Sequence, residues 1–111
     1  MGGSILPVAV AHGEGRTEFA DSAEMAAVRE RGQIVLRYVQ ANHEVALRYP
    51  DNPNGAGEGL AGLTGANGQV LIMMPHPERV YRACQNVWSD PAWGEDGPWL
   101  RLFRNARRAL G

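Results

Sequence analysis

A run of apolar residues, 70–74, is followed directly by Pro75-His76-Pro77-Glu78. An unbroken apolar run of this length predicts a strand in the interior of a sheet covered on both faces. Asn67-Gly68, just before the run, is typical of a two-residue hairpin turn, so residues 60–64 are expected to pair with it. The run therefore commits the chain to a layered fold built around a sheet.

Three helices and three further strands are predicted around this hairpin. Asp21 and Glu24 have capping-box spacing, and Gly32 would end the helix that they begin. Pro98 would open the last helix, which places an apolar stripe opposite four arginines. The stripe is Trp99, Leu102, Phe103, Ala106 and Leu110. The strands are expected at residues 5–11, 34–39 and 45–49, and a helix at residues 78–88. The pattern predicts an α/β fold.

Composition limits the function classes. The chain has 111 residues, which is one small domain or part of one. Eleven arginines face twelve acidic residues, so a net charge of -1 gives no electrostatic reason to expect nucleic acid or a membrane surface. A single cysteine excludes an internal disulfide and fits a cytoplasmic location. The sequence has neither a signal-peptide pattern at its start nor an apolar run of the ~20 residues that a membrane helix needs.

His76 and Glu78 are the strongest candidates for chemistry. Catalytic sites of α/β proteins gather at the carboxyl ends of strands, which is where the pattern places His76. A histidine with a carboxylate two residues on can act as the base and the orienting group of a nucleophilic triad. On spacing alone, the simpler interpretation remains open: His76 closes the strand and Glu78 caps the next helix.

Other polar groups give weaker hypotheses. The loop at residues 12–16 has two glycines, but it matches neither a dinucleotide fingerprint nor a phosphate-binding loop, and a plain turn explains it. Cys84 is expected inside a helix as a small buried residue rather than as a nucleophile. The histidines lie far apart and the lone cysteine offers no second thiolate, so no metal site is predicted. Trp88, Trp93 and Trp99 are expected to pack against the last helix.

Long stretches of the chain resemble one enzyme family. They are Ser4-Ile5-Leu6-Pro7-Val8-Ala9-Val10-Ala11-His12-Gly13-Glu14-Gly15-Arg16, Arg48-Tyr49-Pro50-Asp51-Asn52-Pro53-Asn54-Gly55, Ile72-Met73-Met74-Pro75-His76-Pro77-Glu78-Arg79-Val80, and Trp93-Gly94-Glu95-Asp96-Gly97-Pro98-Trp99-Leu100-Arg101 through Arg107. In this order they resemble the C-terminal part of the phosphoribosylformylglycinamidine synthases, in their large single-chain form. The resemblance covers nearly the whole chain.

The resemblance implies a function in de novo purine biosynthesis. These ligases make formylglycinamidine ribonucleotide from formylglycinamide ribonucleotide, ATP and glutamine, with magnesium. Their C-terminal domain is a class I glutamine amidotransferase of flavodoxin-like, three-layer fold, in which a cysteine, a histidine and a glutamate release ammonia from glutamine. His76 and Glu78 match the histidine and the glutamate, and Gly13 and Glu14 match a segment that lines the glutamine pocket.

The chain departs from the complete family domain in one respect. The family's nucleophile lies on a Gly-rich turn before the segment that Ile5 begins, and Cys84 does not match it. Residues 1–111 are therefore expected to be the C-terminal portion of the amidotransferase domain, lacking the nucleophile-bearing half. Such a fragment is expected to be inactive alone, to bind no cofactor itself, and to self-associate through an exposed strand edge.

Two alternatives stay open. The chain could be a free-standing, non-catalytic α/β binding or interaction module that keeps the scaffold without the chemistry. It could also be a self-contained hydrolase with Cys84 as nucleophile and His76 as base, which is the weaker hypothesis.

Overall fold

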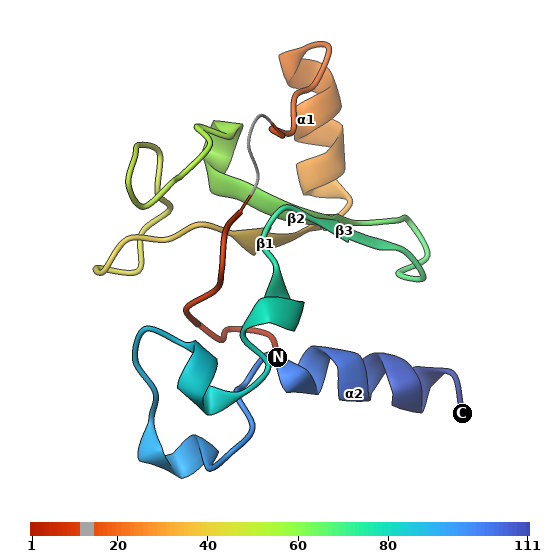
Figure 1. Ribbon diagram of the computed structural model, residues 1–111. Coiled ribbons are helices and arrows are strands. Elements are labelled where there is room, and N and C mark those ends of the chain that lie inside the picture. The colour runs from red at the N-terminus through yellow and green to blue at the C-terminus, as the bar shows by residue number, and fades with distance from the viewer. Residues whose placement is uncertain (12–14) are drawn as a thin grey trace. The chain divides into compact units, whose positions relative to one another are not determined.

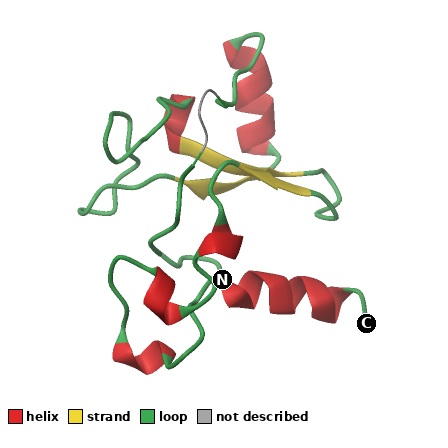
Figure 2. Ribbon diagram, viewed as in Figure 1, coloured by secondary structure: helices red, strands yellow, loops and turns green. Residues whose placement is uncertain are grey.

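A computed structural model describes residues 1–11 and 15–111 (Figure 1). The chain divides into two compact units, one of residues 1–11 and 76–111 and the other of residues 12–75. The secondary structure combines helices with one antiparallel sheet (Figure 2), so the predicted α/β class is confirmed. No helix in the described part of the chain is long and apolar enough to span a membrane.

The sheet belongs to the unit of residues 12–75. Its strands are β1 (Ile34–Arg37), β2 (Leu60–Thr64) and β3 (Leu71–Met73), arranged in the order β1-β2-β3. All neighbours are antiparallel. The β2–β3 hairpin turns at Gly68, which has a φ of 72°. The hairpin therefore turns at the predicted place, but the prediction of a two-residue loop is wrong: the backbone N–H of Gly65 bonds to the carbonyl of Val70, which leaves residues 66–69 as the loop.

Helix α1 (Ser22–Glu30) begins and ends where its sequence signals indicate. The Asp21 carboxylate accepts a hydrogen bond from the backbone N–H of Glu24 at 2.9 Å, which satisfies one of the unpaired donors of the first turn. The Glu24 side chain accepts from the backbone N–H of Ala20. Gly32 follows the helix with a φ of 68°, a conformation that glycine adopts at low cost.

The expectation that residues 70–74 form an interior strand is wrong. β3 is an edge of the sheet, and its Leu71 and Ile72 are 42% and 59% exposed. On the opposite edge, Val35 of β1 is also exposed. The physical reason is that, among the described residues, β3 pairs with β2 alone. Self-association of the chain was expected from exposed strand edges and apolar side chains, and both are present here. Self-association itself stays a prediction.

Three other expected elements are absent from the described residues. Residues 5–11 carry no strand hydrogen bonding, and the strand expected at 45–49 is reduced to a single bridge between Val39 and Val45. The helix expected at 78–88 is replaced by two short 3-10 turns, Pro77–Arg79 and Ala83–Gln85. The chain between these turns instead pairs with residues 95–97, because the backbone N–H of Gly97 bonds to Tyr81 and that of Ala83 to Glu95.

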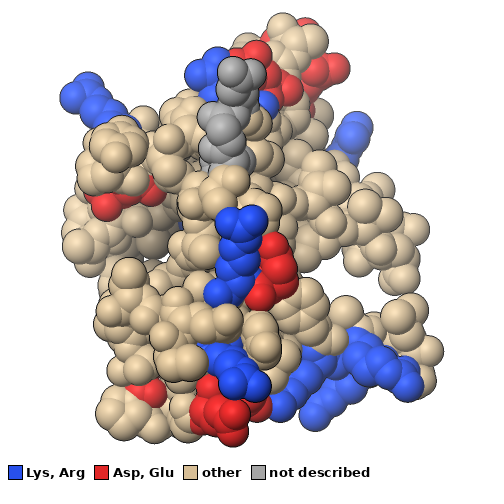
Figure 3. Space-filling model, in the orientation of Figure 1, with Lys and Arg blue, Asp and Glu red and all other residues tan. Residues whose placement is uncertain are grey.

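Helix α2 (Leu100–Ala109) lies in the unit of residues 1–11 and 76–111. Its arginines gather along the helix (Figure 3), and Arg104 pairs with Asp96 at 2.7 Å. The predicted apolar stripe is largely uncovered: Trp99 is buried, but Phe103 and Leu110 are exposed. The three tryptophans were expected to pack against this last helix, but Trp88 is 56% exposed. Trp88 and Trp93 form their own pair with ring centroids 5.2 Å apart.

Asn52 holds the loop that joins β1 to β2. Its side chain is fully buried, donates to the carbonyls of Ala46 and Ala56, and accepts from the backbone N–H of Ala56. A buried amide that satisfies backbone groups on both sides of a loop fixes that loop in one conformation. The Pro- and Gly-rich segment 50–62 is therefore ordered by a side chain from within its own sequence.

Replacing Asn52 with alanine should lower the free energy of unfolding by about 2–4 kcal/mol, because the carbonyl of Ala46 loses its buried donor and a cavity replaces the amide. Urea unfolding followed by circular dichroism measures the loss. Asn42→Ala is the matched control, since Asn42 is exposed and caps only its own turn. Equal losses in both variants would contradict the anchoring role.

Candidate active site

His76 lies on a short corner between β3 and the 3-10 turn Pro77–Arg79. Pro75 and Pro77 on either side of it are buried, and each proline ring fixes its own φ. The backbone N–H of His76 donates to the carbonyl of Ala9 at 2.8 Å, and its carbonyl accepts from Arg79 at 3.1 Å. Both backbone groups of His76 are thus engaged, which fixes the position from which its side chain extends.

The His76 and Glu78 side chains contact each other directly. His76 Nδ1 lies 2.8 Å from Glu78 Oε1. The 3-10 turn brings the two side chains together although they are only two residues apart. The imidazole is 31% exposed and the carboxylate 56% exposed, so both groups are within reach of a ligand in solution.

The charge on Glu78 determines which ring nitrogen of His76 carries the proton. The hydrogen bond from His76 is the largest cause that lowers the pKa of the Glu78 carboxyl from its usual 4.5, and the backbone N–H of Glu78 lowers it further. At neutral pH this carboxylate is ionised and can only accept hydrogen bonds, so Nδ1 of His76 must be the donor. In the neutral imidazole, the lone pair is then on Nε2.

This arrangement can accept and return a proton. Nε2 can take a proton from a nucleophile, and Glu78 then stabilises the imidazolium through Nδ1–H. A histidine and a carboxylate arranged in this way can serve as the base and the orienting group of a nucleophilic triad. The sequence spacing predicted this pair of residues; it did not predict the carbonyl of Ala9 as a partner, because no local signal links positions so far apart in the chain.

The element and the exposure of Cys84 differ from what the sequence predicts. It lies in the 3-10 turn Ala83–Gln85 and is exposed rather than buried in a helix. In the described part of the chain, the recorded side-chain partner of His76 is Glu78, and no hydrogen bond joins His76 to Cys84. The geometry therefore gives no support to Cys84 as the nucleophile that His76 activates.

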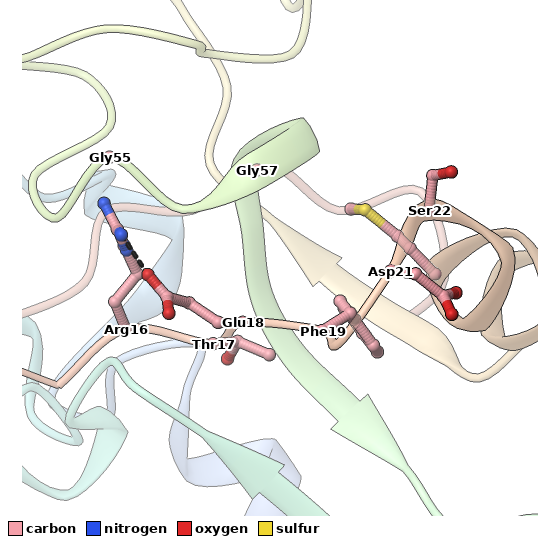
Figure 4. Close-up of a pocket in the computed structure, with 9 residues that line it drawn as sticks. Arg16, Thr17, Glu18, Phe19, Asp21, Ser22, Gly55 and Gly57 are labelled. Atoms are coloured by element: carbon pink, nitrogen blue, oxygen red, sulfur yellow. Dashed lines mark hydrogen bonds and ion pairs between the residues drawn. The ribbon is translucent and has the colours of Figure 1, made fainter.

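Gly13 and Glu14, the predicted pocket-lining residues, lie outside the described residues, as does His12. The chain just after them lines an open cavity of about 460 Å³ in the unit of residues 12–75 (Figure 4). Arg16 points toward Gly55 there and pairs with Glu18, while Asp21 is occupied as the helix cap. The charged groups of this cavity are thus already engaged with each other or with backbone.

Metal ligation has no candidate in residues 1–11 and 15–111: no group of three or more His, Cys, Asp or Glu side chains is placed to hold an ion. His43 lies in a turn with a φ of 70°, and His76 is engaged by a single carboxylate.

Comparison with known protein families identifies the kind of domain that the chain forms. The family described as CobB/CobQ-like glutamine amidotransferase domain matches residues 1–109. The chain belongs to this family. It is a glutamine amidotransferase domain over nearly its full length, and glutamine is the substrate that this domain implies. The α/β fold of the amidotransferase domain agrees with the fold class predicted from the sequence.

Proposed function

We propose that this amidotransferase domain serves a phosphoribosylformylglycinamidine synthase. In this proposal the chain provides the base and the orienting carboxylate of a glutaminase site, and the released ammonia converts formylglycinamide ribonucleotide to formylglycinamidine ribonucleotide in de novo purine biosynthesis. The observation that supports it is the 2.8 Å contact of His76 Nδ1 with Glu78 Oε1 in a chain of this family. The four long sequence stretches that resemble the synthases support the specific enzyme.

His76 and Glu78 are the proposed catalytic residues. A cysteine thiol loses its proton to His76 Nε2, and the thiolate forms a bond to the carboxamide carbon of glutamine. The imidazolium, held by Glu78, returns the proton to the leaving nitrogen, so that ammonia departs and a thioester remains. Water, deprotonated by His76, then cleaves the thioester to glutamate and the free thiol. Gly13 and Glu14 are proposed to line the glutamine pocket.

The nucleophile of this proposal comes from the half of the domain that residues 1–111 do not contain. Cys84 is exposed and does not bond to His76 in the described structure, so it is not assigned the role. The proposed enzyme uses ATP and magnesium in the cytoplasm. The described residues of this chain do not fit a magnesium ion, because they bring no three suitable ligands together, and no step is assigned to either group here.

Complementation in trans tests the proposal. The synthase truncated before this segment is mixed with the separate chain, and product formation is measured with glutamine and then with ammonium. We expect the wild-type chain to restore the glutamine-dependent rate. His76→Ala should reduce that rate by at least about 10³-fold and leave the ammonium-dependent rate unchanged, since triad members act as a unit.

The controls separate the alternatives. His43→Ala replaces an exposed histidine of the unit of residues 12–75 and should have no effect on either rate. Binding of the two parts without recovery of glutamine use would contradict the proposed site and favour a non-catalytic binding module. Glutamine hydrolysis by the chain alone, abolished by Cys84→Ala, would instead support a self-contained hydrolase.

A further inference from the structure

The corner that carries His76 depends on a segment from the other end of the sequence. Residues 5–11 form no strand, yet Ala9 accepts the backbone N–H of His76 at 2.8 Å. An irregular segment holds such a carbonyl in place only if it is fixed by other contacts, because each free residue has conformational entropy to lose. The question is therefore what fixes residues 5–11.

Trp99 supplies that contact. Its indole Nε1–H donates to the carbonyl of Pro7 at 2.6 Å, across a sequence separation of 92 residues. Trp99 is buried, with 6% exposed, and Pro7 is half-buried, so this hydrogen bond is partly shielded from water. Pro7 itself has a fixed φ, and only Val8 separates it from Ala9, which limits the movement of the Ala9 carbonyl relative to Pro7.

Trp99 is in turn held on both sides. Gly97, two residues before it, donates its backbone N–H to Tyr81 at 2.7 Å. A Cβ added at Gly97 would lie 2.9 Å from the carbonyl oxygen of Val80, so this approach is close. The carbonyl of Trp99 accepts from Leu102 in the first turn of α2. The indole thus projects from a fixed backbone.

We propose that Trp99 is a positioning residue for His76, acting through its hydrogen bond to Pro7 and the bond of Ala9 to the His76 backbone. Trp99 touches no reacting atom. This inference rests on the proposed function, since it gives a role in catalysis only if His76 is the base. A misplacement of about 1 Å at a catalytic group is enough to cost roughly 10²-fold in rate.

Hydrogen exchange on the unmodified chain gives the first test. The Trp99 indole N–H and the His76 backbone N–H should both be protected and should open with the same free energy, because the same movement of residues 5–11 releases them. Protection of the indole with free exchange of the His76 amide would overturn the proposal. This measurement needs no variant that has to fold.

Trp99→Phe removes the N–H and keeps an aromatic ring. We expect the His76 amide to exchange roughly five- to tenfold faster, as the loss of one hydrogen bond implies. The pKa of Glu78 should also rise toward its usual value, because the bond from His76 is the largest cause that lowers it. A carbon-detected titration of the Glu78 carboxyl follows this change, which a general loss of stability would not produce.

Trp93→Phe is the matched control, since Trp93 is a tryptophan of the same unit that stacks on Trp88. It should change neither the His76 amide nor the Glu78 titration. Pro7→Ala keeps the accepting carbonyl but frees φ, and should shift both readouts in the same direction as Trp99→Phe. Identical behaviour of Trp99→Phe and Trp93→Phe would overturn the proposal.

The complemented glutaminase assay completes the test. Trp99→Phe should lower kcat for glutamine by about 10- to 100-fold with KM little changed, because the base is misplaced while the substrate pocket is not. Unchanged kcat in a variant whose His76 amide exchanges freely would overturn the positioning role. If His76→Ala retains full glutamine use, the proposed function fails. The hydrogen exchange of the His76 amide and the titration of Glu78 would still show, independently, whether Trp99 positions His76.

Discussion

Gly59→Ala is expected to destabilise the chain by about 2–5 kcal/mol, a large fraction of the stability of a small domain. Gly59 has a φ of 66°, which costs a residue with a Cβ about 1–2 kcal/mol. The added methyl would also lie 2.7 Å from Val45 Cγ1, 2.9 Å from the carbonyl oxygen of Ala46 and 3.0 Å from that of Tyr38. Overpacking of this kind costs a further 1–3 kcal/mol or so.

Gly68→Ala separates the cost of a positive φ from the cost of overpacking. Gly68 has a similar φ of 72°, but an added Cβ would meet nothing within 4 Å. This variant should lose only about 1–2 kcal/mol. Urea unfolding of both variants, followed by circular dichroism, gives the comparison. Losses within about 0.5 kcal/mol of each other would show that the close approach of Gly59 to the Tyr38–Ala46 pairing does not matter.

Glu78→Gln should lower the glutamine-dependent rate of the complemented enzyme by about 10³- to 10⁴-fold. The amide has no charge to stabilise the imidazolium, and its NH₂ group can favour the wrong tautomer of His76. The ammonium-dependent rate should not change. Glu95→Gln is the control, because it makes the same substitution at an exposed side chain of the same unit. A loss smaller than tenfold would contradict the orienting role.

The pH dependence follows from the lowered pKa of Glu78. A carboxyl whose pKa is lower in the folded than in the unfolded chain stabilises the folded chain at pH values above the unfolded pKa. This contribution is lost as the pH falls through the folded pKa. Glu78 therefore stays ionised from neutral pH to below 4.5. A titration of the wild-type carboxyl should show this, and His76→Ala should move its midpoint upward. A midpoint at or above 4.5 in the wild-type chain would contradict the hydrogen bond.

Local signals predicted the parts of the fold that short-range contacts determine. The Asp21 cap, the end of α1 near Gly32 and the turn at Gly68 each depend on residues within a few positions. The contact between His76 and Glu78 also has a local signature, since the two residues lie two positions apart at one 3-10 turn. These features are therefore readable from sequence.

Long-range pairing determines what the sequence did not predict. The helix expected at 78–88 is absent because residues 81–83 bond to residues 95–97, which local helix propensity does not take into account. Residues 70–74 are apolar enough for an interior strand, but which strands flank them depends on segments elsewhere. The link from Trp99 to Pro7 crosses most of the chain and has no local signature.

The exposed thiol of Cys84 gives this chain a practical use. Cys84 is the only cysteine of the sequence, so a maleimide dye reacts at a single known position without any prior substitution. It lies in the same unit as His76 and eight residues after it. A dye at this position would report, through its anisotropy, when the labelled chain joins a larger partner. Association could then be titrated in the same cuvette in which glutamine turnover is followed.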